Sequence, residues 1–267
     1  MNDIQALAQL MHAYDGLMLG IAMCSIRLFA AFNVLPPMGD QFLTGTTRSA
    51  VVVLIGTFIA MGLPAGAVES LTAAQWAMLT MKETLLGLLI GWGGSIVFWT
   101  VESVGALIDT QAGFNNVQMS NPLSGEQNTP VSHMLLQLVV CLFYILGGML
   151  VFLGAMFDSY KVWPPLAPWP TLGGAGESVF LQQLDEMMRI IVKFAAPAII
   201  VMLLIEVGFG VLARAADKLD PHSLSQPVKG LVTMLLLALM TGVLITQIRY
   251  SILPFHLLER LHQLLPV

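Results

Sequence analysis

Six apolar stretches, each long enough to cross a membrane, constrain this chain more than any other feature. They cover residues 16–35, 49–68, 84–101, 134–157, 190–213 and 228–248. A stretch of about 18 to 24 residues makes a helix of roughly 27 to 36 Å, which matches a hydrocarbon core of about 30 Å. The sequence therefore predicts an all-α, membrane-associated protein whose long, partly kinked hydrophobic helices form hairpins.

The composition excludes several classes of protein. Hydrophobic residues make up 57% and charged residues 10% of the 267 residues, against roughly 45–50% and 25% in soluble domains. A net charge of −5 without a Lys/Arg run disfavours nucleic acid as a partner. Two cysteines, both in apolar stretches, provide neither a disulfide framework nor a CxxC site. Because the first fifteen residues lack Lys and Arg, we expect them to belong to the mature protein.

Ionised side chains interrupt the apolar stretches. Arg27, Lys193 and Glu206 would each cost about 2.5–3.5 kcal/mol near the membrane centre. Lys193 and Glu206 are about 20 Å apart along a helix, too far to pair with each other. We expect these three to make buried contacts with other helices or with partner subunits, and snorkelling to an interface or a local pair is the alternative. For Glu83 and Glu102, near segment ends, snorkelling or a local pair is favoured.

Small residues and loop charges bear on helix packing. Gly87 and Gly91 have the GxxxG spacing, and Gly147–Gly148 lies within the fourth stretch. These glycines indicate close helix packing or the general glycine enrichment of membrane helices. Loop Lys and Arg are divided almost equally between the two sides, so the positive-inside rule does not orient the chain. Such a balance is expected if some helices pack against partner subunits instead of lipid.

The segment 102–133 is the longest loop rich in polar residues, and it contains no Lys or Arg. Within it, residues 113–130 are mainly Asn, Gln, Ser, Gly and Pro, which is turn chemistry. Loops of this length are usually functional or disordered. An external solvated loop would carry more charge, whereas an amide-rich, nearly uncharged segment suits the inside of a pore.

A second loop, residues 213–230, predicts the charged tip of a helical hairpin. Asp220–Pro221 would end one helix, and Ser225 and Pro227 would begin the next. The charged residues of this tip are Arg214, Asp217, Lys218, Asp220 and Lys229.

No catalytic constellation is present in the sequence. The histidines lack HExxH spacing, and GxSxG, P-loop and GxGxxG motifs do not occur. Asp109 is a candidate acid without a mate. We therefore expect a protein without enzymatic activity, metal or other cofactor.

Four segments resemble one family, the T component of the type III secretion export apparatus, called SctT in injectisomes and FliR in flagella. They are GALIDTQAGFNN from Gly105, NPLSGEQNTP from Asn121, FDSYKVWP from Phe157, and PAIIVMLLIEVGFGVLARAADKLDPHSLSQPVKG from Pro197. The resemblance extends over roughly residues 20–250. The SY-x-x-WP element and the NPLSGEQ loop are more similar to injectisome members than to flagellar ones.

The resemblance implies a structural subunit of a gate in the bacterial inner membrane, within the secretion system basal body. One such subunit would close a helical ring of R and S components through which unfolded proteins are exported. Residues 1–183 would be R-like and residues 184–267 an S-like hairpin. The implied partners are R, S, the U/FlhB-type switch protein, the V/FlhA-type component, the inner rod, secreted proteins in transit and membrane lipid.

The family resemblance also implies a plug, a loop that lies in the pore and corresponds to residues 111–130. The residues expected to line or block the channel are Gln111, Phe114, Asn115, Asn116, Met119, Asn121 and Pro122. The hairpin tip would face the cytoplasm and the switch protein. Arg27, Lys193 and Glu206 would be charges buried between subunits.

Two other classes of protein compete with this interpretation. A secondary transporter of a small solute would act alone and would show inverted repeats with broken helices. Pro197 and Gly93–Gly94 are possible breaks, but the halves show no internal symmetry. An intramembrane hydrolase would need a Ser/His, paired Asp or HExxH set within helices.

Overall fold

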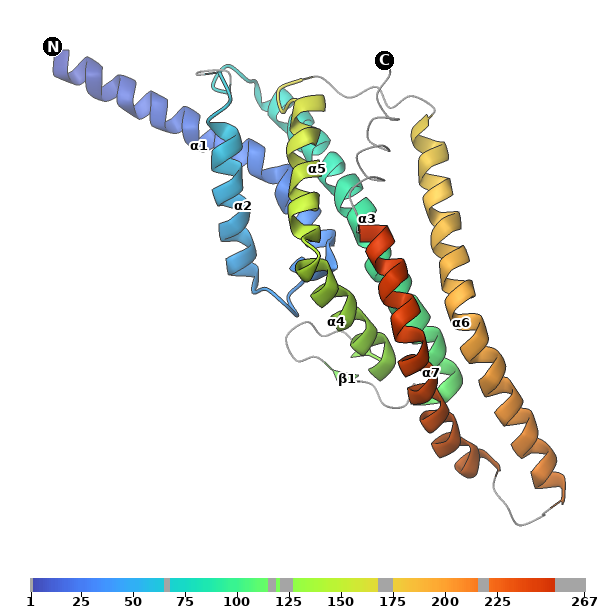
Figure 1. The fold of residues 1–267 in the computed structure, drawn as a ribbon. Coiled ribbons are helices and arrows are strands. Elements are labelled where there is room, and N and C mark those ends of the chain that lie inside the picture. The colour runs from blue at the N-terminus through green and yellow to red at the C-terminus, as the bar shows by residue number, and fades with distance from the viewer. Residues whose placement is uncertain are drawn as a thin grey trace. The chain divides into compact units, whose positions relative to one another are not determined.

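A computed structural model describes residues 2–64, 68–114, 119–120, 127–167, 175–215 and 221–252, and these residues fold as an all-helical protein (Figure 1). The helices are α1 Asn2–Val34, η1 Pro36–Met38, α2 Gly45–Ala60, α3 Ala73–Ala112, α4 Pro130–Ile145, α5 Gly148–Val162, α6 Ala175–Ala215 and α7 Pro221–Ile252. The all-α prediction is confirmed. One addition is a two-residue antiparallel pair, β1 Met119–Ser120 with β2 Gln127–Asn128.

Fewer helices can span a membrane than the six that the sequence predicts. Among the described residues, four helical segments are long and apolar enough, and a bent pair makes a fifth candidate. The four are Tyr14–Val34, Ala73–Ala112, Phe180–Arg214 and Leu224–Thr246. The second predicted stretch is instead α2, a helix of 16 residues that ends before Met61 and Gly62.

The predicted helix over 134–157 is in fact broken. α4 and α5 meet at an angle of 70°, and Gly147 at the break has φ +75°. A side chain at that φ is strained, whereas glycine adopts it readily. A Cβ built on Gly147 would meet nothing within 4 Å, so this glycine permits a turn and does not bring helices together.

α3 is longer than the predicted helix 84–101 at both ends. At its start, the Gln75 side-chain oxygen accepts a hydrogen bond from Thr72 N at 2.8 Å, and Thr72 Oγ1 accepts one from Gln75 N at 3.4 Å. This reciprocal pair is a capping box, which fixes a helix N-terminus. Gly113, with φ +81°, follows the last residue of α3, as is common after a helix C-terminus.

The last helix also begins earlier than predicted. Pro221, expected to end the preceding helix, is the first residue of α7, and Pro227 lies inside that helix. Proline is well tolerated at the first helical position because the N–H it lacks has no partner there.

The chain divides into two compact units. The first contains residues Met1–Ser95 and Phe152–Thr171, and the second contains Ile96–Val151 and Leu172–Val267. In the first unit, a Cβ on Gly91 would lie 2.7 Å from the Ala31 carbonyl oxygen, and one on Gly87 would fall on the Arg27 carbonyl. Close helix packing at this GxxxG pair is thus confirmed.

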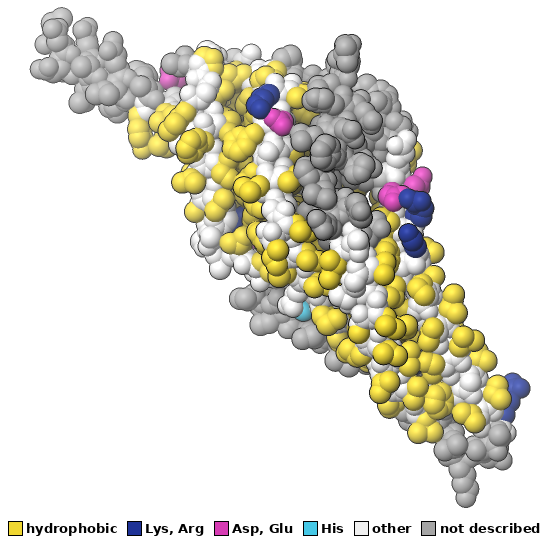
Figure 2. Space-filling model, in the orientation of Figure 1, with side chains coloured by type: hydrophobic (Ala, Val, Ile, Leu, Met, Phe, Trp, Pro, Cys, Tyr) yellow, Lys and Arg dark blue, Asp and Glu magenta, His cyan; other side chains and the backbone are white. Residues whose placement is uncertain are grey.

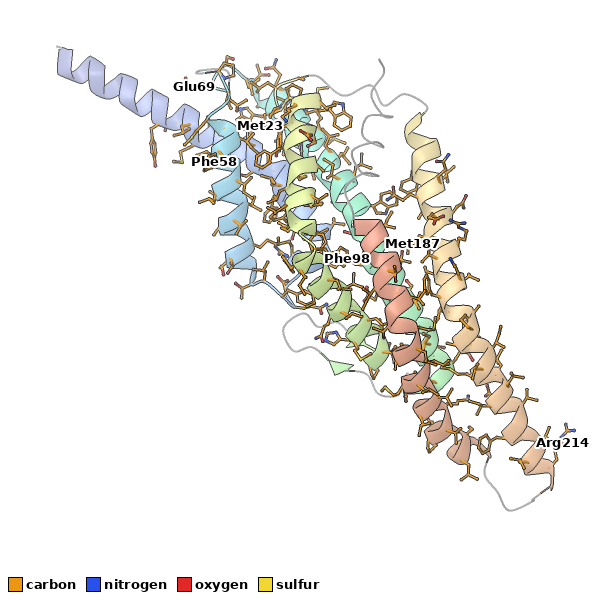
Figure 3. The ribbon with its side chains drawn as sticks, in the orientation of Figure 1. Met23, Phe58, Glu69, Phe98, Met187 and Arg214 are labelled. Atoms are coloured by element: carbon orange, nitrogen blue, oxygen red, sulfur yellow. The ribbon has the colours of Figure 1, made fainter. Side chains whose placement is uncertain are left out.

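In the second unit, aromatic side chains join α3 to α4. Phe98, labelled in Figure 3, meets Phe143 edge-to-face with ring centroids 5.3 Å apart. Such edge-to-face pairs add about 0.5–1.5 kcal/mol to the burial of the rings. In the same unit α6 packs along α7 as a hairpin.

Candidate functional site

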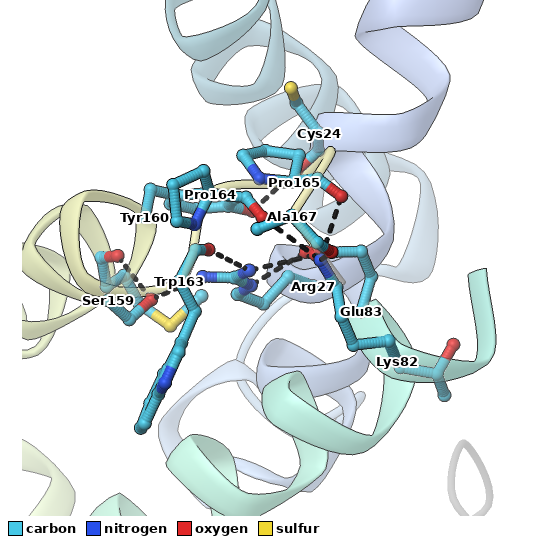
Figure 4. A network of polar contacts seen from close by, with 12 residues as sticks. Cys24, Arg27, Lys82, Glu83, Ser159, Tyr160, Trp163, Pro164, Pro165 and Ala167 are labelled. Atoms are coloured by element: carbon cyan, nitrogen blue, oxygen red, sulfur yellow. Dashed lines mark hydrogen bonds and ion pairs between the residues drawn. The ribbon is translucent and has the colours of Figure 1, made fainter. Parts of the chain in front are cut away.

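A buried ion network lies in the first unit, where α1 meets α3 (Figure 4). Arg27 and Glu83 are fully buried, and Lys82 is 2% exposed. Arg27 Nε donates to Glu83 Oε2 at 2.7 Å and Nη2 donates to Oε1 at 2.9 Å. This two-point contact between guanidinium and carboxylate is the strongest kind of ionic hydrogen bonding.

The other donors of Arg27 hold the end of α5. Nη1 donates to Ser159 Oγ at 3.0 Å and Nη2 to the Trp163 carbonyl at 2.8 Å. The Tyr160 ring lies 4.1 Å from the guanidinium carbon, close enough for a cation–π contact. Tyr160 in turn donates its hydroxyl to the Cys24 carbonyl at 2.6 Å.

Lys82 fixes the backbone that follows α5. Its Nζ donates to the carbonyls of Pro164, Pro165 and Ala167 at 3.0, 2.8 and 2.9 Å, and it lies 3.1 Å from Glu83 Oε1. An ammonium group has three N–H donors, so these acceptors saturate it. The network therefore holds α1, α3 and residues 163–167 together.

The charged side chains of the apolar stretches differ in their burial and in their partners. Arg27 contacts other helices of its own chain, and Glu83 is buried beside it. Of the two alternatives for Glu83, snorkelling is wrong, and Glu83 instead pairs with Arg27 and with the adjacent Lys82. Glu206 on α6 is 55% exposed and lies 3.4 Å from Lys229 of α7. Lys193 is exposed, with its Nζ 5.9 Å from the Phe194 ring centroid. Contacts of Lys193 and Glu206 with other subunits stay predictions.

The second site is the base of the loop 113–129, in the second unit. Asp109 is fully buried in α3. Its carboxylate accepts the backbone N–H of Val131 at 3.0 Å and that of Ser132 at 2.9 Å. These are first-turn amides of α4, which have no partner inside their own helix. Asp109, from the sequence alone a candidate catalytic acid without a partner residue, thus caps a neighbouring helix.

Two further contacts hold the loop ends. Ser132 Oγ donates to the Glu102 carbonyl at 3.1 Å, and a Cβ on Gly105 would lie 2.5 Å from Ser132 Cα. The α3 end of the loop rests on α7, where Gln226 Nε2 donates to the Gly113 carbonyl at 3.1 Å. The Phe114 ring is 3.4 Å from where a Cβ on Gly230 would be.

The plug residues expected from the sequence fall partly within the described structure. Gln111 lies in the last turn of α3, Phe114 comes two residues after that helix ends, and both are half-buried, while Met119 is in β1. Asn115, Asn116, Asn121 and Pro122 lie outside the described residues.

The predicted hairpin tip is described only at its edges. Arg214 is exposed at the end of α6, as Figure 3 shows, whereas Lys229 is 6% exposed in α7. Asp217, Lys218 and Asp220 lie outside the described residues.

Sequence reasoning missed Lys82 and Gln226. Lys82 lies just outside the predicted stretch 84–101, but Thr72 and Gln75 have the capping-box spacing that marks the true start of α3. With that start, Lys82 and Glu83 lie inside a helix. No local signal identifies Gln226, since its partner Gly113 is 113 residues away.

The hairpin of the second unit exposes a broad apolar surface, visible along α6 and α7 in Figure 2. Of the most apolar 18-residue segment of each helix, only 28% is buried in α6 and 22% in α7, against 50% in α3. The exposed apolar side chains on α6 include Val192, Ile200, Leu203, Leu204, Val207, Val211 and Leu212.

Together, these features define a multi-span helical membrane protein whose polar groups serve structure. Within the described ranges, no three His, Cys, Asp or Glu side chains gather where they could hold a metal ion. A sequence profile of the family described as "Bacterial export proteins, family 1" matches residues 18–253. The chain belongs to this family, the T/FliR components of the type III secretion export apparatus, which are inner-membrane structural proteins and not enzymes.

Individual relatives agree with this membership. The chain is 31% identical to "Yop proteins translocation protein T" of Yersinia pestis, over 80% of this chain and 82% of the relative. It is 27% identical to "Surface presentation of antigens protein SpaR" of Shigella flexneri, over 88% and 89%. Identity to the "Flagellar biosynthetic protein FliR" of Bacillus subtilis is 21%, over 84% and 86%. The similarity is thus greater to these secretion proteins than to this flagellar one.

Proposed function

We propose that this chain is the subunit that closes a helical gate of R and S components and plugs the pore through which unfolded proteins leave the cytoplasm. The observation that carries the proposal is the α6–α7 hairpin, whose apolar segments are mostly exposed in the described part of the chain. Its exposed Lys193 and Glu206 make a purely lipid environment costly. Neighbouring protein can supply both apolar cover and countercharge.

The division of labour follows the same proposal. Residues 184–267, which include most of the hairpin, act as an S-like part, and residues 1–183 act as an R-like part that holds the plug. The tip between α6 and α7 faces the cytoplasm and the U/FlhB-type switch protein. The V/FlhA-type component and the inner rod are further partners.

The plug is proposed for residues 111–130. The loop is rich in Asn, Gln, Ser and Gly and contains no Lys or Arg, so it tolerates water without holding small anions tightly. Its two ends are tied to α3 and α7 by the contacts of Asp109 and Gln226. These contacts anchor the described ends of the loop, which supports the proposed plugging role.

Deletion of residues 114–127 tests the plug. The contacts of Asp109 with α4 lie outside the deletion, so the complex should assemble and purify normally. Ion conductance of the purified complex in a planar bilayer should then rise well above that of the intact complex. Unchanged conductance with normal assembly would contradict a plugging role.

A further inference from the structure

The two ends of the loop 113–129 are held by different chemistry. At the α4 end, Asp109 is fully buried and offers a carboxylate to two backbone N–H groups. At the α3 end, one neutral side chain, Gln226, donates to the Gly113 carbonyl from a half-buried position. Hydrogen bonds to a charged acceptor are about twice as strong as neutral ones, so the α4 end is held more firmly.

Several features make Asp109 a demanding residue to replace. The helix N-terminus of α4 carries a partial positive charge that favours a carboxylate. Ser132 packs against Gly105 of α3 so closely that a Cβ on that glycine would lie 2.5 Å from Ser132 Cα. Asp109 is four residues before Gly113. Its carboxylate accepts hydrogen bonds from the backbone N–H groups of Val131 and Ser132, which come just after the loop ends. It therefore bridges the point where the chain leaves α3 and the point where it returns.

We propose that Asp109 is the positioning residue of the loop 113–129. Its carboxylate ties the start of α4 to α3 and so determines where the loop returns. Asp109 acts on the pore only through the loop, and this inference rests on the proposed plugging role. The role is one of positioning, because the carboxylate of Asp109 accepts hydrogen bonds from the backbone amides of Val131 and Ser132.

The local part of the inference is tested by hydrogen exchange on the assembled complex. In Asp109→Asn, the side chain loses its charge and one of its two oxygens becomes an NH2 group, so the remaining oxygen accepts the α4 amides only as a neutral acceptor. The amides of Val131 and Ser132 should then exchange about tenfold faster, as expected when hydrogen bonds to a charged group are replaced by neutral ones. Unchanged exchange of these two amides would overturn the inference without reference to any pore.

A matched control separates this effect from the simple loss of a negative charge. Asp158 is a partly exposed carboxylate of α5 that pairs with Lys161 three residues later. Such surface pairs contribute little to stability. Asp158→Asn should leave both the amide exchange and the conductance unchanged.

The functional part is tested by combining Asp109→Asn with deletion of residues 114–127. In the intact loop, Asp109→Asn should raise ion conductance toward that of the loop-deleted complex. In the loop-deleted complex, the same substitution should add nothing. A further rise there would show that Asp109 acts outside the loop, and would overturn the inference.

The outcomes distinguish the inference from the function on which it rests. If loop deletion raises conductance but Asp109→Asn does not, the plug stands and the positioning role fails. If loop deletion itself changes nothing, the plugging role fails, and hydrogen exchange still decides the local tie. Should Asp109→Asn reduce assembly, Ser132→Ala provides a milder test, since it removes only the bond to the Glu102 carbonyl. Because the amides bound by Asp109 stay in place, Ser132→Ala should change amide exchange and conductance less than Asp109→Asn, and an equal or larger effect would count against the inference.

Discussion

At the scale of single residues, the ion network of the first unit places two cations beside one carboxylate. Arg27 and Lys82 both contact Glu83, and backbone carbonyls together with the Ser159 hydroxyl accept the remaining hydrogen bonds of the two cations. A buried ion pair is stable only when its geometry is good and its other polar atoms are satisfied. Glu83 is thus the residue on which both cations depend.

Because two cations share one carboxylate, we expect Glu83→Gln to lower the free energy of unfolding more than Arg27→Met does. Removal of the carboxylate leaves two buried cations facing each other, and breaking a buried pair costs about 3–5 kcal/mol. Removal of Arg27 leaves Lys82 and Glu83 as a neutral pair 3.1 Å apart. Denaturant unfolding in detergent, followed by circular dichroism, measures both losses.

A control for these variants is Lys161→Met, which removes an exposed cation from a pair with Asp158 and should cost well under 1 kcal/mol. An Arg27→Met loss equal to or larger than the Glu83→Gln loss would show that Lys82 does not share the carboxylate as the distances indicate.

At the scale of helices, glycine has two distinct uses. Gly113 and Gly147 have φ of +81° and +75° and stand where helices end. Gly87 and Gly91 lie inside α3 and allow α1 to come close. Only the second use creates a contact surface, and it leaves no room for a side chain.

Gly91→Ala is therefore predicted to be destabilising, although alanine is the better helix former. The new Cβ would lie 2.7 Å from the Ala31 carbonyl oxygen and 2.9 Å from Ala31 Cα. Because these are backbone atoms of a helix, α1 and α3 would have to separate, at a cost of about 1–3 kcal/mol. The change in unfolding free energy in detergent checks this prediction.

The matched variant is Gly154→Ala in α5, where a Cβ meets nothing within 4 Å. It should be neutral or stabilise by up to about 1 kcal/mol. Similar effects of the two substitutions would mean that α1 and α3 do not approach each other at Gly91.

The sequence predicted the helical class, because hydrophobic periodicity and composition are local properties. For the GxxxG pair it offered close packing as one of two explanations, and the structure decides between them. The sequence placed the starts of α3 and α7 wrongly, since apolar runs show where a helix is buried and not where its caps lie. It identified Arg27 as a residue in need of partners but not Glu83, Ser159 and Trp163 as those partners. Such pairs join residues 56 to 136 positions apart, and no local pattern encodes them.

At the scale of the whole molecule, this member of the export family exposes much apolar surface on its α6–α7 hairpin. Lys229 is nearly buried. Within the described residues, the carboxylate that pairs with it belongs to the exposed Glu206. In the proposed gate, neighbouring subunits cover this pair and exclude water from it. A charge pair is strengthened when water is excluded.

Glu206→Leu is therefore predicted to reduce co-purification with partner subunits. The substitution leaves Lys229 without its carboxylate at a surface that assembly buries, and truncation of one partner of a buried pair at an interface costs about 2–5 kcal/mol. Recovery of partner chains on a tagged protein in mild detergent should fall at least tenfold. Glu186→Leu, which removes a carboxylate paired with Arg189 on the same helix, serves as the control, and equal recovery of partners by both variants would speak against an interface at Glu206.

The most direct test of the central claim is the composition and mass of the tagged protein purified from its native membrane in mild detergent, measured by native mass spectrometry. Our account predicts one copy of this chain in a complex with several copies of other short, highly apolar chains. A monodisperse monomer, free of other polypeptides and stable in that state, would contradict it.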